Sequence, residues 1–388
     1  MKYPDKDMAA LHLYPVNKAL RCFFRGTPLT HPWGLDGGRP GRQHPRKKHR
    51  SAWVNKFRMG EIKKAALLLP LILFPTWAPA LSLEEYPLAE TFLADISGKH
   101  GFPREQLKQI LLDAKIKESI LKAISRPAEA KPWHEYRNIF LTEKRIRHGV
   151  DFWRQHQALL DKAEQSYGVP PHIITAILGV ETFYGTRTGS FRVLDALSTL
   201  AFAYPRRAVF FGKELEHFLL LSREENLDPR QPQGSYAGAM GWPQFMPSSY
   251  RQYAADFDGD GKRDIWSNPG DVIASVANYF VSHGWRPNQP VAVKLSKPAP
   301  DMASNTLKAP FTLAYLKAKG ISIQKSYPPK LKANVLKLAG ENGDEYWLGF
   351  TNFYVITRYN HSPLYAMAVH QLSQAIRERF LREAGNAY

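Results

Sequence analysis

A glutamate on the apolar face of a predicted helix is the residue best suited to chemistry in this 388-residue sequence. The segment GVPPHIITAILGVETFYG covers residues 168–185, and its two prolines suit the first positions of a helix, where a backbone N–H has no intrahelical partner. Ile174, Ile177 and Leu178 then recur at helical spacing. Glu181 takes the next position on that face, where a leucine would be expected.

The protonation state of Glu181 depends on whether this face is buried. Burial disfavours a charged carboxylate, so it raises the pKa and keeps the group protonated near neutral pH, as a general acid requires. In the other interpretation, Glu181 lies at the edge of the apolar stripe and reaches water or a salt bridge. The spacing leaves both open, because structural carboxylates can also have shifted pKa values.

A second cluster of carboxylates has the spacing of a calcium site. In DFDGDGKRDIWS, Asp256, Asp258 and Asp260 occupy positions 1, 3 and 5 of an EF-hand loop, and a glycine follows at position 6. Lys262, at position 7, would contribute its backbone carbonyl. We call residues 256–271 the acidic loop. Such an oxygen cage would stabilise the fold, since it leaves no open position for a substrate.

The closing ligand of this loop departs from the EF-hand pattern. Ser267 stands where a bidentate glutamate belongs. The carboxylate of Asp271 or Asp264 is therefore the candidate for that role. The alternative is a solvated Asp/Gly turn that binds no metal.

Two further segments combine aromatic rings with amide and hydroxyl groups, a mixture that suits a sugar. They are the glycine-rich loop GSYAGAMGWPQFMPSSY (residues 234–250) and NFYVITRYNHSPLYAM (residues 352–367). The glycine spacing fits neither nucleotide-binding motif, GxGxxG or GxxxxGK[ST]. The alternative is an ordinary loop whose rings pack inward. The residues concerned are Ser235, Tyr236, Trp242, Gln244, Phe245, Tyr359, Asn360 and Tyr365, with Tyr136, Tyr204 and Tyr279 from other segments.

Helical periodicity dominates the segments that must position these groups. It predicts a mainly α (α+β) protein with short helices in 83–124, then 143–167, 193–225, 272–283 and 366–381. Residues 291–345 mix β-prone runs, prolines and one short amphipathic helix, which indicates a small inserted α/β lobe. We expect an N-terminal helical lobe (81–145), a catalytic core (146–290), this lobe, and a return to the core (346–388).

The N-terminal residues have a different composition. Residues 59–80 have two lysines, an apolar run and a final Ala-Pro-Ala, which is typical of a cleaved signal peptide. Residues 1–58 carry 13 Lys and Arg against 3 Asp, so they supply +10 of the net charge of +18. We expect them to be an upstream extension without a stable fold, and Met59 to be the true start.

Composition and missing motifs narrow the function. The single cysteine, Cys22, precedes the predicted cleavage site, so the exported chain would have no disulfide and no cysteine for lipidation. We expect a periplasmic monomer without a membrane anchor. No nucleic-acid-binding motif accompanies the basic charge. The sequence also lacks HExxH, GxSxG and CxxC, which leaves metalloprotease, serine hydrolase and redox functions unsupported.

Six motifs, in order, resemble those of the lytic murein transglycosylase B family. They are GVETFYG, YPRR, GSYAGAMGWPQFMPSSY, DFDGDG, SVANYF and ITRYNHS, and the resemblance runs from about Leu88 to the C-terminus. It implies a lysozyme-like helical core, with an EF-hand-like calcium loop, that cleaves the glycan strands of peptidoglycan.

The resemblance also implies roles for individual residues. Glu181 matches the catalytic acid. A structural calcium ion and no organic cofactor are implied, with Asp256, Asp258, Asp260, the Lys262 carbonyl and Asp271 as its ligands. The saccharide cleft would be lined by Tyr136, Arg206, Arg207, Ser235, Gln244, Phe245, Tyr279, Tyr359, Asn360 and Tyr365.

A single carboxylate is compatible with one type of glycoside cleavage. Most glycosidases use two carboxylates. In lytic transglycosylation of the MurNAc-GlcNAc β-1,4 bond, the C6 hydroxyl of N-acetylmuramic acid attacks its own C1, so no carboxylate has to activate water. The product carries a 1,6-anhydro end. Two alternatives remain: a muramidase that uses water, and a non-catalytic, calcium-stabilised peptidoglycan-binding protein.

Overall fold

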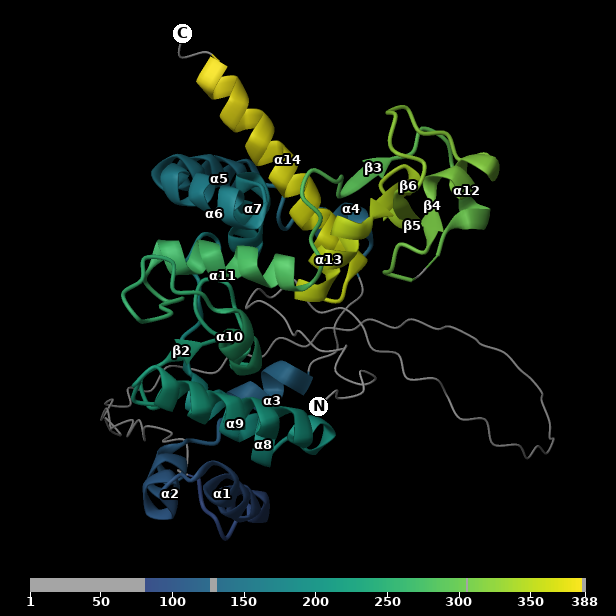
Figure 1. The fold of residues 1–388 in the computed structure, drawn as a ribbon. Coiled ribbons are helices and arrows are strands. Elements are labelled where there is room, and N and C mark those ends of the chain that lie inside the picture. The colour runs from purple at the N-terminus through teal and green to yellow at the C-terminus, as the bar shows by residue number, and fades with distance from the viewer. Residues whose placement is uncertain (1–80, 126–130, 305, 386–388) are drawn as a thin grey trace, which may run out of the picture. The chain divides into compact units, whose positions relative to one another are not determined.

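Helices make up most of the computed structural model, which describes residues 81–125, 131–304 and 306–385 (Figure 1). The expected mainly helical α+β class is confirmed. The predicted extension (1–58) and signal peptide (59–80) lie outside the described residues. The helices up to the candidate acid are α1 (Pro87–His100), α2 (Arg104–Asp113), α3 (Glu118–Ser125), α4 (Trp133–Arg137), α5 (Glu143–Gln155), α6 (Gln157–Tyr167) and α7 (Pro171–Thr182).

The remaining helices alternate with long loops. Where the sequence predicts one helical stretch over 143–167, the structure has two, because the chain turns at His156 between α5 and α6. The later helices are α8 (Val193–Phe202), η1 (Pro205–Arg207), α9 (Ala208–Glu224), α10 (Pro247–Tyr253), α11 (Pro269–Ser282), η2 (Pro300–Met302), α12 (Leu313–Ala318), α13 (Thr351–Tyr359) and α14 (Pro363–Gly385).

Helix α7 is the central element of the core. Every residue from Ile173 to Thr182 is buried, because α5, α6, α11 and α14 all pack against this helix (Figure 1). Its sequence is mostly apolar, as a helix that is buried on all sides requires. Proline at its first position and a positive φ of +51° at Phe183 mark its two ends.

Two small antiparallel sheets complete the described fold. Strands β1 (Phe191–Arg192) and β2 (Gln233–Gly234) pair with each other. The larger sheet has the order β3-β6-β5-β4 and packs with α12 around its own apolar cluster, which includes Leu316 and Val335. Its strands are β3 (Ala292–Lys294), β4 (Phe311–Thr312), β5 (Lys332–Gly340) and β6 (Gly343–Phe350).

The sheet lies in the segment for which the sequence predicts an α/β lobe, but its last strand extends past the predicted end. Strand β6 continues to Phe350, so the predicted boundary at residue 345 falls inside it. Hairpin pairing between Ala333 and Phe350 explains the difference, since register with a neighbouring strand cannot be read from local periodicity. Within the described residues, no helix combines the length and the apolar character needed to cross a membrane.

Candidate active site

Glu181 lies in the last turn of α7 and is only 5% exposed. Of the two interpretations that the spacing left open, burial is therefore the one that the structure shows, and among the described residues no cation forms a salt bridge with its carboxylate. Burial raises the pKa of Glu181 to about 8, and a hydrogen bond from Tyr365 acts in the opposite direction. The group is therefore protonated at neutral pH and able to donate a proton.

Three tyrosines surround this carboxylate. The hydroxyl of Tyr365, in α14, donates to Oε1 of Glu181 over 2.5 Å. Those of Tyr359 and Tyr279 donate to the carbonyls of Pro243 and Arg358, each over 2.6 Å. Burial raises the pKa of all three hydroxyls well above the ordinary value, so the rings stay neutral.

Helix α7 is tied to the glycine-rich loop (residues 234–250) beside these tyrosines. Thr182 donates its hydroxyl proton to the carbonyl of Trp242 over 2.9 Å. Phe245 packs against Tyr279 and Tyr359, with ring centroids 5.7 and 5.9 Å away. The loop therefore supplies one wall of the Glu181 site.

Two polar residues of the glycine-rich loop show how the loop holds its shape. Ser235 is fully buried, and its hydroxyl oxygen accepts the N–H groups of Ala237 and Ala239. Gln244 has a positive φ of +54° and donates its amide to the carbonyl of Thr188 over 3.0 Å. Its buried Oε1 has no hydrogen-bond partner among the described residues. This orphaned acceptor is suited to a ligand hydroxyl or amide.

The remaining predicted cleft residues differ in placement. Tyr136 is buried in α4, with its ring centroid 5.5 Å from that of Phe140. Asn360, directly after α13, is also buried. Arg206 is exposed on η1, whereas the guanidinium of Arg207 lies 4.3 Å from the ring centroid of Phe210 in α9. The described contacts of Arg207 thus run to α9 rather than to Glu181.

A buried cation that was not predicted from the sequence lies at the C-terminal end of α7. Arg145, in α5, is 4% exposed and donates from Nε to the carbonyl of Gly179 over 3.0 Å. It also donates to the carbonyl of Ile139, and its guanidinium lies 5.3 Å from the ring centroid of Phe183. A signal was present, because Arg145 lies four residues before the buried Gly149, on the apolar face of α5.

The turn after Glu181 is held by contacts to α5, the helix that carries Arg145. Phe183 and Tyr184 have φ values of +51° and +59°, a conformation that costs energy in non-glycine residues. The hydroxyl of Tyr184 donates to the carbonyl of Arg145 over 2.7 Å. A Cβ atom on Gly149 or Gly179 would lie only 2.6 Å from that hydroxyl oxygen. The two glycines therefore admit the ring that holds the turn.

The acidic loop (residues 256–271) brings three carboxylates together. Ligand oxygens of Asp256, Asp258 and Asp260 all lie within 4.8 Å of one another, and the three residues are exposed. Asp256 also accepts the N–H groups of Gly259 and Gly261, and Gly261 makes the sharp turn with a φ of +84°. Three hard oxygen donors on a closed turn fit a calcium ion.

Asp271 lies outside this group of three. Its buried carboxylate accepts the backbone N–H groups of Phe257 and Asp264, each over 2.8 Å, so it joins the two arms of the loop. Burial raises its pKa. Asp264, the other candidate for closing ligand, instead accepts the N–H groups of Trp266 and Ser267.

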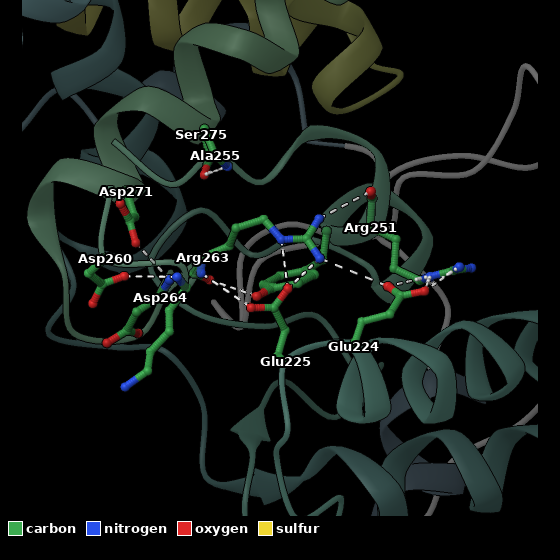
Figure 2. A network of polar contacts seen from close by, with 11 residues as sticks. Glu224, Glu225, Arg251, Ala255, Asp260, Arg263, Asp264, Asp271 and Ser275 are labelled. Atoms are coloured by element: carbon green, nitrogen blue, oxygen red, sulfur yellow. Dashed lines mark hydrogen bonds and ion pairs between the residues drawn. The ribbon is translucent and has the colours of Figure 1, made fainter. Parts of the chain in front are cut away.

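An ion-pair network anchors the acidic loop to the end of α9 (Figure 2). Nε of Arg263 donates to Glu225 over 2.7 Å, and Arg251 pairs with Glu224 over 2.6 Å. Lys262, whose carbonyl is a predicted ligand, donates its backbone N–H to Asp260 over 2.8 Å. The loop is thus held to the core independently of the three clustered aspartates.

Comparison with known proteins identifies the fold. A family model described as "Transglycosylase SLT domain" matches residues 85–374. The membrane-bound lytic murein transglycosylase B of Escherichia coli strain K12 is 47% identical over 300 residues, which cover 75% of this chain and 82% of that protein. Solved structures of lytic transglycosylases match with TM-scores above 0.7, and two of them illustrate the likeness.

The first is soluble lytic transglycosylase SltB1 from Pseudomonas aeruginosa, with a TM-score of 0.72 and 51% identity, over 76% of this chain and 99% of that one. The second is Escherichia coli lytic transglycosylase Slt35 in complex with calcium, with a TM-score of 0.73 and 46% identity, over 78% of this chain and 97% of that one. The helical core is lysozyme-like, as in these relatives, and the family model matches most of the length of the chain. The chain therefore belongs to the family of the transglycosylase SLT domain.

Proposed function

We propose that Glu181 carries out lytic transglycosylation of the MurNAc-GlcNAc β-1,4 bond of peptidoglycan, as acid and then as base. Activity on peptidoglycan as a lytic transglycosylase follows from the family and from the similarity to its members. The assignment to Glu181 rests on one observation: it is a buried carboxylate whose pKa is raised to about 8 and whose described partner is a tyrosine. No second carboxylate perturbs it among the described residues.

The proposed reaction has two proton transfers. Glu181 first donates its proton to the glycosidic oxygen as the bond from that oxygen to C1 of N-acetylmuramic acid breaks. The C6 hydroxyl of the same sugar then attacks C1, and its proton passes to the Glu181 carboxylate. The acid is regenerated, and the sugar ends as a 1,6-anhydro ring. Intramolecular attack needs no activated water, which fits a site with a single carboxylate.

The residues around Glu181 are proposed to bind the sugars. The unpartnered Oε1 of Gln244 would accept from a hydroxyl or an N-acetyl N–H, and the buried rings of Tyr279, Tyr359 and Tyr365 would form the wall around Glu181. In the described contacts, Ser235 shapes the glycine-rich loop, so it would act mainly by positioning. The full proposed set is Tyr136, Arg206, Arg207, Ser235, Gln244, Phe245, Tyr279, Tyr359, Asn360 and Tyr365.

We also propose that the acidic loop holds a structural calcium ion. Asp256, Asp258 and Asp260 would ligate it with the Lys262 carbonyl, and the solved complex of Slt35 with calcium supports this choice of metal. Asp271 is the proposed closing ligand, since each of its oxygens accepts one N–H and keeps a further lone pair. The ion would neutralise the clustered charge.

Product analysis tests the proposed reaction. Purified sacculi are digested, and the muropeptides are identified by mass spectrometry. Transglycosylation gives anhydro ends, which are lighter by one water molecule than the reducing ends of a hydrolase. Reducing ends as the main product would establish the muramidase alternative instead.

A pair of buried glutamates provides the matched control. Glu181→Gln should lower glycan cleavage by at least ~10²–10⁴-fold, since the amide cannot donate a suitable proton. Glu214 is equally buried, at 5% exposure, but its carboxylate accepts from Ser248. Glu214→Gln should therefore retain activity at temperatures where it is folded. Near-normal cleavage by Glu181→Gln would favour a different acid. Absence of cleavage in the unaltered protein would favour the non-catalytic alternative.

We further propose that the protein is periplasmic, after removal of residues 59–80. The order of lysines, apolar run and small residues supports export. N-terminal sequencing of periplasmic material should find a start at or near Leu81. Material that retains residues 1–58, or an acylated N-terminus, would refute this proposal.

A further inference from the structure

A pocket of about 520 Å³ lies at the N-terminal end of α7. Its walls come from the start of α7, the connection between α11 and β3, the segment before β5, and α14. His172, which lines it, precedes Glu181 by nine residues, so about 14 Å of helix separates the pocket from the candidate acid. The pocket is therefore distinct from the sugar site.

One wall carries a buried imidazole without a partner. His370, in α14, is 8% exposed, and its Nδ1 has no hydrogen-bond partner among the described residues. Burial lowers the pKa of His370 to about 4, so the ring is neutral and carries one N–H. A buried polar atom without a partner is costly, and among the residues that line the pocket His370 alone has such an atom on its side chain.

The other polar groups of the pocket favour a negative charge. Arg377 and Lys325 both line it, and neither forms an ion pair within the described part of the chain. The N-terminus of α7 has no side-chain cap, and the backbone N–H of His172 finds no acceptor there. One carboxylate, that of the exposed Glu164, also lies on the wall, so the lining carries two cations against one anion.

The size and the remaining walls indicate what the anion is attached to. The volume is that of a small-molecule or peptide site rather than of a single inorganic ion. Asn288, Gln289 and Gln374 offer amides that can pair with a peptide backbone, and Trp285 and Tyr327 offer apolar surface. A short peptide that ends in a free carboxylate would satisfy both the cations and the amides.

We propose that this pocket binds the C-terminal carboxylate of a short peptide, held by Arg377, Lys325 and the N-terminus of α7. The inference does not depend on glycan cleavage by Glu181, because it concerns binding at the other end of the helix.

Calorimetric titration of the full chain with two peptides tests the proposal. The probes are N-acetyl-trialanine with a free carboxylate and the same peptide as its C-terminal amide. The free acid should bind, and the amide should bind at least about tenfold more weakly because it loses charge-assisted hydrogen bonds. Inorganic phosphate is titrated separately.

Variants of α14 locate the site. Arg377→Gln should weaken binding of the free acid about tenfold, whereas Arg382→Gln, an exposed arginine of the same helix, should leave it unchanged. Both residues are exposed, so both variants should fold. Equal binding of acid and amide, no binding of either, or equal effects of the two variants would overturn the proposal. Binding of phosphate without binding of the peptide acid would overturn it as well.

Discussion

The hydroxyl of Tyr365 and the carboxylate of Glu181, 184 residues apart in sequence, are joined by a hydrogen bond of 2.5 Å. Burial alone raises the pKa of Glu181, and this bond stabilises the charged form and so limits the rise. The result is a pKa of about 8. This value keeps the acid protonated at neutral pH and still permits it to release its proton during bond cleavage.

The first prediction concerns the pH dependence of activity. Glu181 must be protonated to begin the reaction, so kcat/KM should fall as pH rises through about 8. Initial rates on a soluble glycan fragment, measured between pH 5 and pH 10, check this. A profile that rises from pH 6 to pH 9 would show that the charged carboxylate is the active form.

The second prediction isolates the Tyr365 hydrogen bond. Because the bond lowers the pKa of Glu181, Tyr365→Phe should raise that pKa further and shift the basic limb of the profile to higher pH. The carboxylate formed after proton donation also loses a donor, so kcat should fall about tenfold. Tyr315→Phe, at a half-exposed tyrosine of α12, is the control. A shift of the basic limb to lower pH would contradict the assigned role.

The third prediction is a stability effect of Glu181 with a defined sign. Its pKa rises from 4.5 in the unfolded chain to about 8 in the native state, so the native state binds more protons between these values. As the pH rises between these two values, the free energy of unfolding should therefore fall by up to about 1.4 kcal/mol for each pH unit. Glu181→Gln removes this dependence. Its melting temperature should exceed that of the unaltered protein at pH 8 and approach it at pH 5. Thermal unfolding at both pH values provides the measurement, and an equal difference at pH 5 and pH 8 would contradict it.

Local spacing singled out both carboxylate features, although it left open whether Glu181 is buried and whether the acidic loop binds a metal. Glu181 interrupts an apolar stripe, and Asp256, Asp258 and Asp260 alternate along a turn, so both signals lie within a few residues. The structure confirms that the first is buried and that the three aspartates cluster. The mainly helical class could also be predicted, because helical periodicity is a signal between residues only three or four positions apart.

Pairings between distant segments could not be derived in this way. The bond between Tyr365 and Glu181 depends on how α14 packs against α7, and periodicity gives the face of each helix but not its partner. Arg145 was missed although it occupies the apolar face of α5, because a cation there is usually assigned to an edge. The two hydrogen bonds that Asp271 accepts from backbone N–H groups also form only in the folded loop, so spacing could not predict them.

The fourth prediction tests Arg145 as a positioning residue. Arg145→Met keeps the length of the side chain but leaves the carbonyls of Gly179 and Ile139 without their donor, which should destabilise the protein by about 1–3 kcal/mol. Because the turn after Glu181 also loses support, kcat should fall more than KM rises, at temperatures where the variant is folded. Arg147→Met, at an exposed arginine of the same helix, should change neither quantity. A stability loss without any loss of kcat would restrict Arg145 to a structural role.

The last prediction is that calcium stabilises the fold and takes no part in bond cleavage. The three clustered carboxylates repel one another without a cation, and a ligand that binds only the native state stabilises it by roughly 2.7 kcal/mol at a hundredfold excess over Kd. Chelation should therefore lower the melting temperature, and Asp258→Ala should remove most of the effect of calcium. Asp301→Ala, at an exposed aspartate of η2, should leave that effect intact.

Activity below the new melting temperature should survive chelation, because Glu181 lies in α7 and donates its own proton. Cleavage rates are compared with circular dichroism at the same temperatures, so that loss of activity can be separated from loss of fold. If chelation stops cleavage while the dichroism spectrum is intact, calcium does more than stabilise the fold. If calcium changes neither melting nor cleavage, the acidic loop is a solvated turn, because its arms are already joined by Asp271 and anchored through Arg263 to α9.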